Sequence, residues 1–470
     1  MAPHLPALRR GRAYESLDKS NVVDCRSGQT LATLSQVNAG VIRKDLARAA
    51  ESRAALKKFT VAQLLDICAR AGAEFLNGSL PLDDQQQSPQ AYIETLSATS
   101  GLPWVMVRRN MAKIHDALTH MGTILNGLTR GLDLSVLDAG FGGRLSFYPA
   151  ASSLGLVMPS NSPAVNSLWL PAIPLKIPVM IKPGRDEPWT PYRLIQAFIA
   201  AGCPAEAFGF YPTDHEGAGE ILRHCGRALV FGDKNTTAAY ANNPAIQIHG
   251  PGYSKILVGD DQIERWPEFI DLMVSAISDN GGRSCINASA IVVPKYAAEI
   301  ADALARELGP IAPLAASDEN ARLAGFANVK MAEFIDGAIE EGLKTPGAIE
   351  VTARHRNGPR KARFDGGTYL RPTIVLCDSL DHPLANREFL FPYASVVTVA
   401  QSAMLERIGP SLAVTAITRD RAFIGQLVES PLIERLNIGP LSTMTVSWDQ
   451  PHEGNLFEFL YKRRSIEIAQ

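Results

Sequence analysis

The sequence predicts an α/β protein built on parallel β-sheets, and two observations support this class. Between about residues 145 and 308, short apolar runs alternate with segments of helical spacing, as in consecutive β-α-β units. The 470 residues are 46% hydrophobic and 20% charged, which is typical of a globular protein with a large core. At about 150 residues per domain, we expect two large domains with a small appendage, or three units.

The first 130 residues are predicted to be mostly helical, because residues 41–77 and 104–128 carry apolar residues at helical spacing. A polar loop is expected between them at 83–90. From residue 134 the pattern changes, and short apolar runs predict strands. The expected strands lie at 145–148, 154–158, 175–181, 228–231, 255–258 and 288–293. The expected helices between them lie at 190–202, 236–242, 266–278 and 296–308, and the basic segment 353–363 is expected to be a surface loop.

A domain boundary is predicted near residue 247, where the first alternation ends. Residues 1–247 would then hold the helical region and a first α/β domain, and residues 248–445 a second one. Residues 446–470 would add a C-terminal strand. Polar and apolar residues alternate over 465–468, which suits an edge strand without an obvious partner, and such a strand is a natural contact in a homo-oligomer.

Charge, cysteine spacing and apolar runs exclude several classes. With 46 Lys+Arg against 48 Asp+Glu, the net charge is 46 − 48 = −2, which argues against a nucleic-acid binder. None of the six cysteines forms a CxxC pair, so no metal site is predicted. Five prolines interrupt the longest apolar region, 154–181, and the first 14 residues lack a signal peptide's apolar core. We therefore expect a soluble, cytoplasmic protein without a membrane span.

Three short segments could carry chemistry. In Asn280-Gly-Gly-Arg-Ser-Cys285, flexible glycines could expose the thiol, and the cation of Arg283 could lower its pKa. The alternative is a buried structural cysteine. Pro159-Ser-Asn-Ser-Pro163 could hold the Asn161 amide toward a developing oxyanion, or be an ordinary turn. Lys182 ends a predicted strand and could contact a ribose or phosphate, or be solvated.

Taken in order, five segments resemble the aldehyde dehydrogenase superfamily from about residue 145 to the C-terminus. They are 159–163 (P-S-N-S-P for P-W-N-F-P), 181–183 (I-K-P), 280–285 (N-G-G-R-S-C for N-x-G-Q-x-C), 364–373 (ending in P-T) and 388–392 (E-F-L-F-P for E-I-F-G-P). The resemblance implies the aldehyde dehydrogenase fold, with two parallel-sheet α/β domains and a small β extension for oligomerisation. Residues 132–150 would contribute to that extension, and the chain would form a homodimer or homotetramer.

The resemblance also implies roles for individual residues. Cys285 would be the nucleophile and Asn161 the oxyanion amide, while domain 1–247 would bind a nicotinamide dinucleotide. The implied cofactor contacts are Pro159, Ser160, Lys182, Arg185, Phe231, Gly232, Asp233, Gly250, Glu388 and Leu390. An acyl pocket could be lined by Phe141, Trp169, Met444 and Trp448, although core packing is the favoured role of each.

The sequence departs from the family pattern at four places. Hydrolytic members carry Glu in an E-L-G-G-K segment, and His249 stands at that position here. Arg185 stands where NAD-preferring members often carry Glu, and with Lys182 it would attract a 2′-phosphate. Arg283 replaces the motif Gln, and F-G-D-K at 231–234 replaces F-T-G-S. NADP(H) is therefore favoured, with NAD(H) possible.

The departure at His249 bears on the reaction. It resembles the CoA-acylating branch and the long-chain acyl-CoA reductases, in which the thioacyl group passes to or from coenzyme A. Thiols ionise more easily than water, so loss of a carboxylate base disfavours hydrolysis more than thiolysis. The sequence therefore predicts an oxidoreductase that interconverts an aldehyde and an acyl-CoA thioester. The alternatives are a hydrolytic enzyme with His249 as base, and a non-catalytic binding protein on the same fold.

Overall fold

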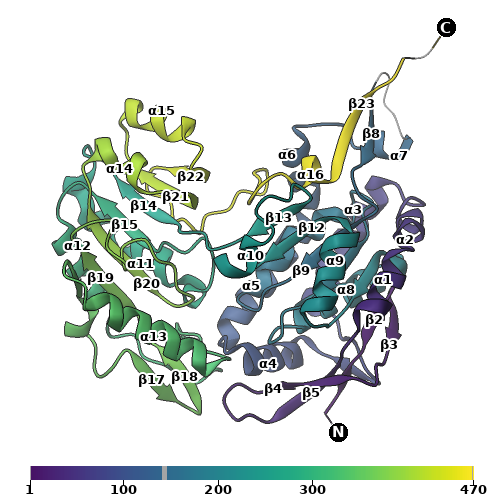
Figure 1. Cartoon of the computed structure of the whole chain (residues 1–470), viewed down its shortest axis with the longest axis horizontal. Helices are drawn as coiled ribbons and strands as arrows, with labels where there is room; N and C mark the ends of the chain where they lie inside the picture. Colours follow the sequence, from purple (N-terminus) through teal and green to yellow (C-terminus); the bar gives the residue numbers. More distant parts are fainter. Residues whose placement is uncertain (1, 140–144, 468, 470) are drawn as a thin grey trace.

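The computed structural model describes residues 2–139, 145–467 and 469, and its fold is built on two seven-stranded sheets in two halves (Figure 1). This confirms the predicted α/β class with parallel sheets. The first sheet has five parallel strands followed by two antiparallel ones. Its order is β13 (Ile246–His249), β12 (Gly226–Phe231), β9 (Ser153–Val157), β10 (Val179–Lys182), β11 (Phe208–Phe210), β2 (Ala7–Arg9) and β3 (Arg12–Tyr14).

The second sheet is parallel except at one edge, where the first strand runs antiparallel to its neighbour. Its order is β16 (Ala348–Glu350), β19 (Thr373–Cys377), β20 (Tyr393–Thr398), β15 (Ala290–Val293), β14 (Lys255–Val258), β21 (Ser411–Ile417) and β22 (Ile433–Ile438). The central strands β14 and β15 are fully buried runs of apolar residues, apart from Lys255. Such runs are expected where helices cover both faces of a parallel sheet.

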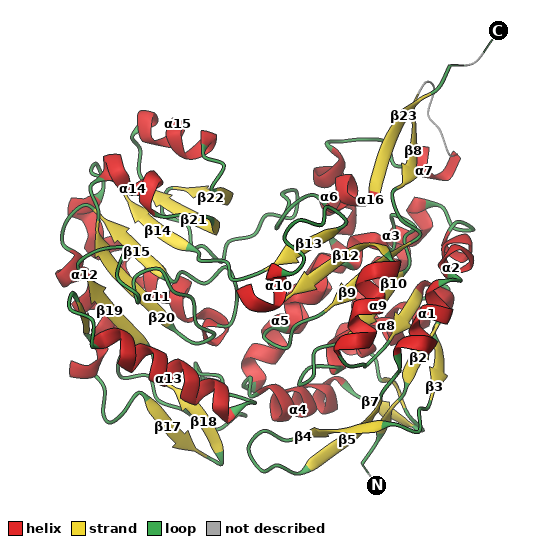
Figure 2. Cartoon of the chain, viewed as in Figure 1, coloured by secondary structure: helices red, strands yellow, loops and turns green. Residues whose placement is uncertain are grey.

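Helices cover the sheets of both halves (Figure 2). Those before the second sheet are α1 (Ala39–Leu46), α2 (Ala49–Leu56), α3 (Val61–Asn77), α4 (Pro89–Ser100), α5 (Trp104–Thr119), α6 (Met121–Thr129), α7 (Val136–Ala139), α8 (Trp189–Ala200), α9 (His215–His224) and α10 (Lys234–Ala238). Those that follow are α11 (Ile270–Ser278), α12 (Ala297–Leu308), α13 (Val329–Leu343), α14 (Gln401–Arg407), α15 (Arg421–Glu429) and α16 (Leu456–Leu460).

Local sequence explains where the longest helix begins. Thr60 accepts a hydrogen bond from the backbone N–H of Gln63, whose side chain accepts one from the Thr60 N–H. This reciprocal cap satisfies two of the free N–H groups at the start of α3. The apolar face of the helix, which includes Leu64 and Phe75, is buried in the core of the first half. The prediction of helices over 41–77 and 104–128 is confirmed.

Three smaller predictions were wrong. Residues 4–35 form strands and their connections, not helices. Three of these strands, β1 (His4–Leu5), β4 (Lys19–Val23) and β5 (Thr30–Ser35), make a separate three-stranded sheet, whereas β2 and β3 belong to the first sheet. The strand expected over 175–181 begins only at Val179, since a short 3-10 segment and a turn precede it. The loop expected at 83–90 contains β7 (Gln85–Gln87), which pairs with β6 (Leu80–Leu82), and the first residues of α4.

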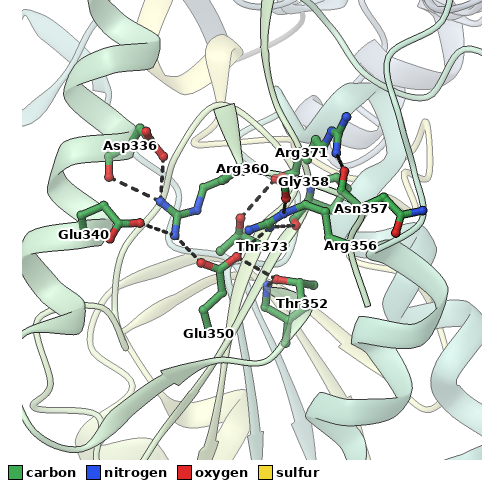
Figure 3. A network of polar contacts seen from close by, with 12 residues as sticks. Asp336, Glu340, Glu350, Thr352, Arg356, Asn357, Gly358, Arg360, Arg371 and Thr373 are labelled. Atoms are coloured by element: carbon green, nitrogen blue, oxygen red, sulfur yellow. Dashed lines mark hydrogen bonds and ion pairs between the residues drawn. The ribbon is translucent and has the colours of Figure 1, made fainter. Parts of the chain in front are cut away.

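The segment 353–363, expected as a surface loop, includes β17 (Lys361–Phe364), which pairs with β18 (Gly367–Leu370), and a buried ionic network (Figure 3). Only 3% of the Arg360 side chain is exposed. Its guanidinium lies 2.7 Å from Asp336, 3.0 Å from Glu340, and in contact with Glu350. Arg360 and Arg356 therefore pair with acidic residues of α13 and β16, while the other Arg and Lys residues of this segment are exposed.

The C-terminal strand also lies elsewhere than expected. It is β23 (Tyr461–Ser465), and it pairs antiparallel with β8 (Leu145–Pro149) in a two-stranded ribbon that projects from the first half (Figure 1). Ile468 of the predicted strand, and residues 140–144 of the predicted extension, lie outside the described residues. Strand β13 ends at His249 and β14 begins at Lys255, so the chain passes between the sheets at 250–254. The predicted domain limits at 247 and 445 stay predictions.

Candidate active site

The loop that carries Cys285 follows α11 and has a left-handed backbone at three successive residues. The φ angles are +54° at Asn280, +65° at Gly281 and +68° at Gly282. A Cβ at Gly282 would lie 2.3 Å from the backbone carbon of Phe391, so only glycine fits there. Cys285 itself is half-buried, and its backbone oxygen accepts a hydrogen bond of 2.9 Å from Ser254 Oγ. The loop thus turns tightly against two neighbouring segments and leaves the thiol partly accessible.

The Asn161 turn lies directly against this loop, as the resemblance implies. Asn161 Nδ2 donates a hydrogen bond of 2.9 Å to the backbone oxygen of Arg283, two residues before Cys285. Its Oδ1 is buried and has no hydrogen-bond partner among the described residues. An amide nitrogen carries two hydrogens, so one remains for a further acceptor. The structure therefore brings Asn161 and Cys285 together.

Asn110 of α5 links these two segments, and sequence reasoning missed it. Its Nδ2 donates 2.8 Å to Asn280 Oδ1, and its Oδ1 accepts from Ser162 Oγ at 3.0 Å and from the Ala164 N–H at 3.2 Å. Asn280 also donates 3.2 Å to Ser162 Oγ. Only 2% of Asn110 is exposed. No local pattern signals this role, since the partners through which Asn110 links the two segments lie 52 to 170 positions away in the chain.

Arg283 does not act as predicted. Its guanidinium is buried and donates to the backbone oxygens of Ser100, at 2.7 Å, and Gly325. It therefore joins the end of α4 to a loop of the second half, and burial lowers its pKa to about 10. The prediction that its cation lowers the pKa of Cys285 is wrong. Burial, followed by the negative charges of Glu453 and Glu388, raises the pKa of that thiol to about 12.

His249 ends β13 and lies in a closed environment. Its ring stacks on Phe231 at the end of β12, with centroids 4.4 Å apart and planes 14° apart. Its Nδ1 contacts Glu453 Oε2, whereas its buried Nε2 has no hydrogen-bond partner in the described part of the chain. The sequence reasoning identified His249 but not its carboxylate partner, which lies 204 residues further along the chain.

Glu453 belongs to a connection between β22 and α16, here called the crossing segment (residues 439–455), which runs between the two halves (Figure 1). Met444 of this segment packs against the same small apolar cluster as Cys285, formed by residues 286, 412 and 413. Trp448 stacks on His120, with ring centroids 5.6 Å apart. Of the other predicted pocket residues, Trp169 is fully buried in the core of the first half, and Phe141 lies outside the described residues.

Glu388 and Lys255 complete the charged surroundings of Cys285. Glu388 accepts a hydrogen bond of 2.7 Å from the Tyr253 N–H, and burial raises its pKa to about 7. Lys255 is fully buried, and its Nζ donates to the Tyr253 oxygen at 2.6 Å and to Ser411 Oγ at 3.0 Å. Burial lowers its pKa to about 8. Both groups can therefore exchange protons near neutral pH.

Several of the residues predicted to bind the dinucleotide lie at the carboxyl ends of the neighbouring parallel strands β9, β10 and β12, where ligands of such sheets bind, whereas Glu388 and Leu390 belong to the second half. Lys182 ends β10 and is half-buried, and burial followed by the charge of Arg185 lowers its pKa. Arg185 is exposed. In the Pro159–Ser160 turn beside them, Ser160 Oγ accepts from the Asp186 N–H at 3.2 Å. Two cations beside a polar turn suit the ribose and phosphate groups of a dinucleotide.

The other predicted contacts are placed as follows. Phe231 ends β12, and the N–H of Gly232, the next residue, donates 3.2 Å to the His249 oxygen. Asp233 caps α10 through a hydrogen bond of 2.8 Å from the Thr236 N–H, which occupies its carboxylate. An added Cβ at Gly250 would meet no atom within 4 Å. Leu390 is 38% exposed.

The structure thus combines two mostly parallel sheets with a half-buried thiol and an asparagine amide that contacts the thiol's loop. These are the features expected of the family that the sequence resembles. The chain belongs to the aldehyde dehydrogenase family, whose sequence pattern matches residues 13–408. It is similar to a mitochondrial aldehyde dehydrogenase of Leishmania tarentolae, with 26% identity over 52% of this chain and 49% of that protein. It is also similar to an aminoacetaldehyde dehydrogenase of Pseudomonas aeruginosa, with 25% identity over 52% and 50%. The chain thus spans about half the length of the curated relatives it matches.

Solved structures share the fold along nearly the whole chain. The aldehyde dehydrogenase KauB of Pseudomonas aeruginosa aligns with a TM-score of 0.81 at 14% identity, covering 99% of this chain and 97% of that one. An indole-3-acetaldehyde dehydrogenase complexed with NAD+ aligns with a TM-score of 0.79 at 17% identity, with the same coverage. Within the described residues, no helix has the length and apolar character needed to cross a membrane.

Proposed function

We propose that the chain is an NAD(P)-dependent oxidoreductase that interconverts an aldehyde and an acyl-CoA thioester through a thioacyl group on Cys285. The observation that carries the proposal is that Asn161 donates to the Cys285 loop, while Glu453, which contacts His249, lies within electrostatic reach of Cys285. A family member needs a thiol nucleophile and an oxyanion donor for any acyl chemistry. His249, at the position where hydrolytic members carry Glu, directs the proposal toward thiolysis.

In the oxidative direction, the Cys285 sulfur adds to the aldehyde carbon. The remaining Asn161 amide hydrogen and the Cys285 backbone N–H would stabilise the oxygen that gains charge. When bound, the nicotinamide cofactor supplies the chemistry that takes a hydride from that carbon. Because burial holds the pKa of Cys285 at about 12, the thiol needs a base that accepts its proton, and His249 Nε2 is the unpartnered acceptor for this role.

The acyl group then leaves Cys285 with a second thiol, that of coenzyme A. A CoA thiol has a pKa of about 8.5 and ionises far more easily than water, so a neutral imidazole suffices as its base. Thiolysis therefore does not require the carboxylate that activates water in hydrolytic members.

Hydrolysis to a carboxylic acid is the second candidate, and one contact favours it. A carboxylate on Nδ1 of His249 is the arrangement that makes an imidazole an effective general base. Such a pair could activate water in place of the usual Glu.

We propose NADP(H) as the favoured cofactor, with NAD(H) also accepted. Lys182 and Arg185 supply two cations at the end of β10, and Arg185 is exposed and can reach a 2′-phosphate. Glu388 would hold the nicotinamide ribose with the carboxylate oxygen that does not accept from Tyr253. We also propose a cytoplasmic homodimer or homotetramer that uses the ribbon of β8 and β23, with an aldehyde or acyl-CoA as its small-molecule substrate.

The test is turnover of an aldehyde panel with NADP+, with and without coenzyme A. We expect NADPH formation that depends on CoA and yields acyl-CoA. Equal turnover without CoA, with free acid as product, would contradict the acylating proposal and support hydrolysis. Cofactor binding without any turnover would support the third reading, a binding protein on this fold.

A further inference from the structure

The crossing segment brings a carboxylate to the imidazole of His249. Glu453 Oε2 contacts His249 Nδ1, and only 4% of the His249 side chain and 19% of the Glu453 side chain are exposed. An ionised carboxylate can only accept hydrogen bonds, so this contact requires the proton on Nδ1. The Nε2 atom of the neutral ring is then left with a lone pair.

The rest of the ring is also fixed. Phe231 stacks on one face at 4.4 Å, and the His249 backbone oxygen accepts from Gly232 at 3.2 Å. Nε2 is buried and meets no hydrogen-bond partner among the described residues. Buried polar atoms are nearly always paired, so an unpaired acceptor in an otherwise fixed ring indicates an atom kept open for a reacting proton.

Glu453 is held to the same strand that carries His249. Gln247, two residues before His249 on β13, donates 2.7 Å from Nε2 to the Glu453 backbone oxygen. Two residues after Glu453, Asn455 donates 2.8 Å to the Leu128 oxygen at the end of α6. The carboxylate therefore approaches the ring from a backbone that is anchored at Glu453 itself and at Asn455.

We propose that Glu453 is a positioning residue that fixes the tautomer and orientation of His249, so that Nε2 accepts the proton released in the Cys285 reaction. The inference rests on the proposed function only in requiring chemistry at Cys285. It holds equally whether coenzyme A or water takes the acyl group.

The neighbouring charges do not compete for the carboxylate. His452 Nδ1 accepts a hydrogen bond of 2.7 Å from Arg435 Nη1, so Arg435 is turned toward His452. Burial, followed by the positive charge of Arg435, lowers the pKa of His452 to about 3, and its ring stays neutral. Cys285 and Glu388 also lie within the electrostatic reach of Glu453, and both have raised pKa values.

The test compares Glu453→Gln with a matched control, Glu434→Gln. Both carboxylates line one cavity of about 470 Å³ beside β13, but Glu434 is exposed and on β22. The amide introduced by Glu453→Gln can donate to Nδ1 and so move the ring proton to Nε2, which removes the base. We expect kcat to fall about 100-fold or more with KM for the cofactor nearly unchanged, as for loss of a general base. The control should keep the wild-type kcat.

The tautomer is measured directly by NMR of the protein with ¹⁵N-labelled histidine, using His249→Gln to assign the signal. We expect Nδ1 protonated and Nε2 unprotonated in the wild type, and the reverse in Glu453→Gln. A wild-type ring with its proton on Nε2, or a Glu453→Gln variant with an unchanged kcat, would overturn the inference. The NMR result on the wild type does not depend on the variant folding. If the wild type turns over no aldehyde, the proposed function fails. The NMR signal still shows whether Glu453 fixes the tautomer of His249.

Discussion

Two buried polar clusters of the second half differ in what they do to the charges they contain. In the cluster around Arg360, the guanidinium of Arg360 faces three carboxylates, and Arg356 lies 2.7 Å from Glu350 (Figure 3). Burial alone would raise the pKa of Glu350, but the positive charges of Arg360 and Arg356 lower it. Burial would likewise lower the pKa of Arg360, but Glu350 and the neighbouring acids raise it. Opposite charges thus keep one another ionised.

Around Cys285 the shifts run the other way. Burial raises the pKa of Cys285 and of Glu388 and lowers that of Lys255, in each case toward the neutral form. The comparison teaches that a buried polar cluster supports structure when its charges are balanced. It supports chemistry when its groups are left able to exchange protons, and perturbed groups of this kind mark functional sites.

Removing the thiol should produce the largest effect. Cys285→Ala takes away the nucleophile, so we expect turnover to fall by about 10⁴-fold or more while cofactor binding is kept. Steady-state kinetics and a cofactor titration measure both. Cys25→Ala, at another half-buried thiol, is the control that should stay active. Retained turnover in Cys285→Ala would show that the cluster around Cys285 has no chemical role.

Breaking the Arg360 cluster should affect stability and not chemistry. Arg360→Met removes the cation that faces Asp336 and one of the two buried cations that face Glu350, so we expect a loss of about 3–5 kcal/mol in the free energy of unfolding. Urea denaturation measures it, with Arg421→Met on the exposed start of α15 as control. An unchanged urea midpoint would show that the ionic network contributes nothing to the fold.

The protonation of Glu388 should appear in the pH dependence of stability. Its pKa is about 7 in the folded protein and 4.5 as the reference value, so the folded state binds this proton more tightly. The stabilisation is therefore complete below about pH 4.5 and is lost as pH rises through about 7, by at most about 3 kcal/mol. Glu388→Gln cannot ionise and should lack this part of the decline. Identical pH profiles of wild type and variant would mean that Glu388 ionises as in water.

The smallest effect is expected at Arg185 of the proposed cofactor site, which belongs to neither cluster. Arg185→Glu puts a negative charge where a 2′-phosphate would bind, so we expect the preference for NADP over NAD to fall by about tenfold or more. The ratio of kcat/KM for the two cofactors measures this preference. Arg421→Glu should leave it unchanged, and an unchanged ratio in Arg185→Glu would place Arg185 outside the cofactor site.

Sequence reasoning succeeded where a feature is local in the chain. Apolar runs predicted β9, β12, β14 and β15, because the buried apolar residues of such a strand follow one another directly in the sequence. It failed where pairing partners lie far apart. Glu453 and Asn110 have no distinctive neighbours, and their roles appear only when the fold brings them to His249 and Asn280. The burial of Arg356 and Arg360 within the basic run at 353–363 was missed, because the acids that pair with them belong to other elements.

The central claim, that Cys285 carries the acyl group, is tested most directly by mass spectrometry of the acid-quenched enzyme. After mixing with an aldehyde and NADP+ but no coenzyme A, the peptide containing Cys285 should gain the mass of one acyl group, and adding CoA should remove it as acyl-CoA. Aldehyde oxidation at full rate with that peptide unmodified throughout, or with the acyl group on another residue, would contradict the account.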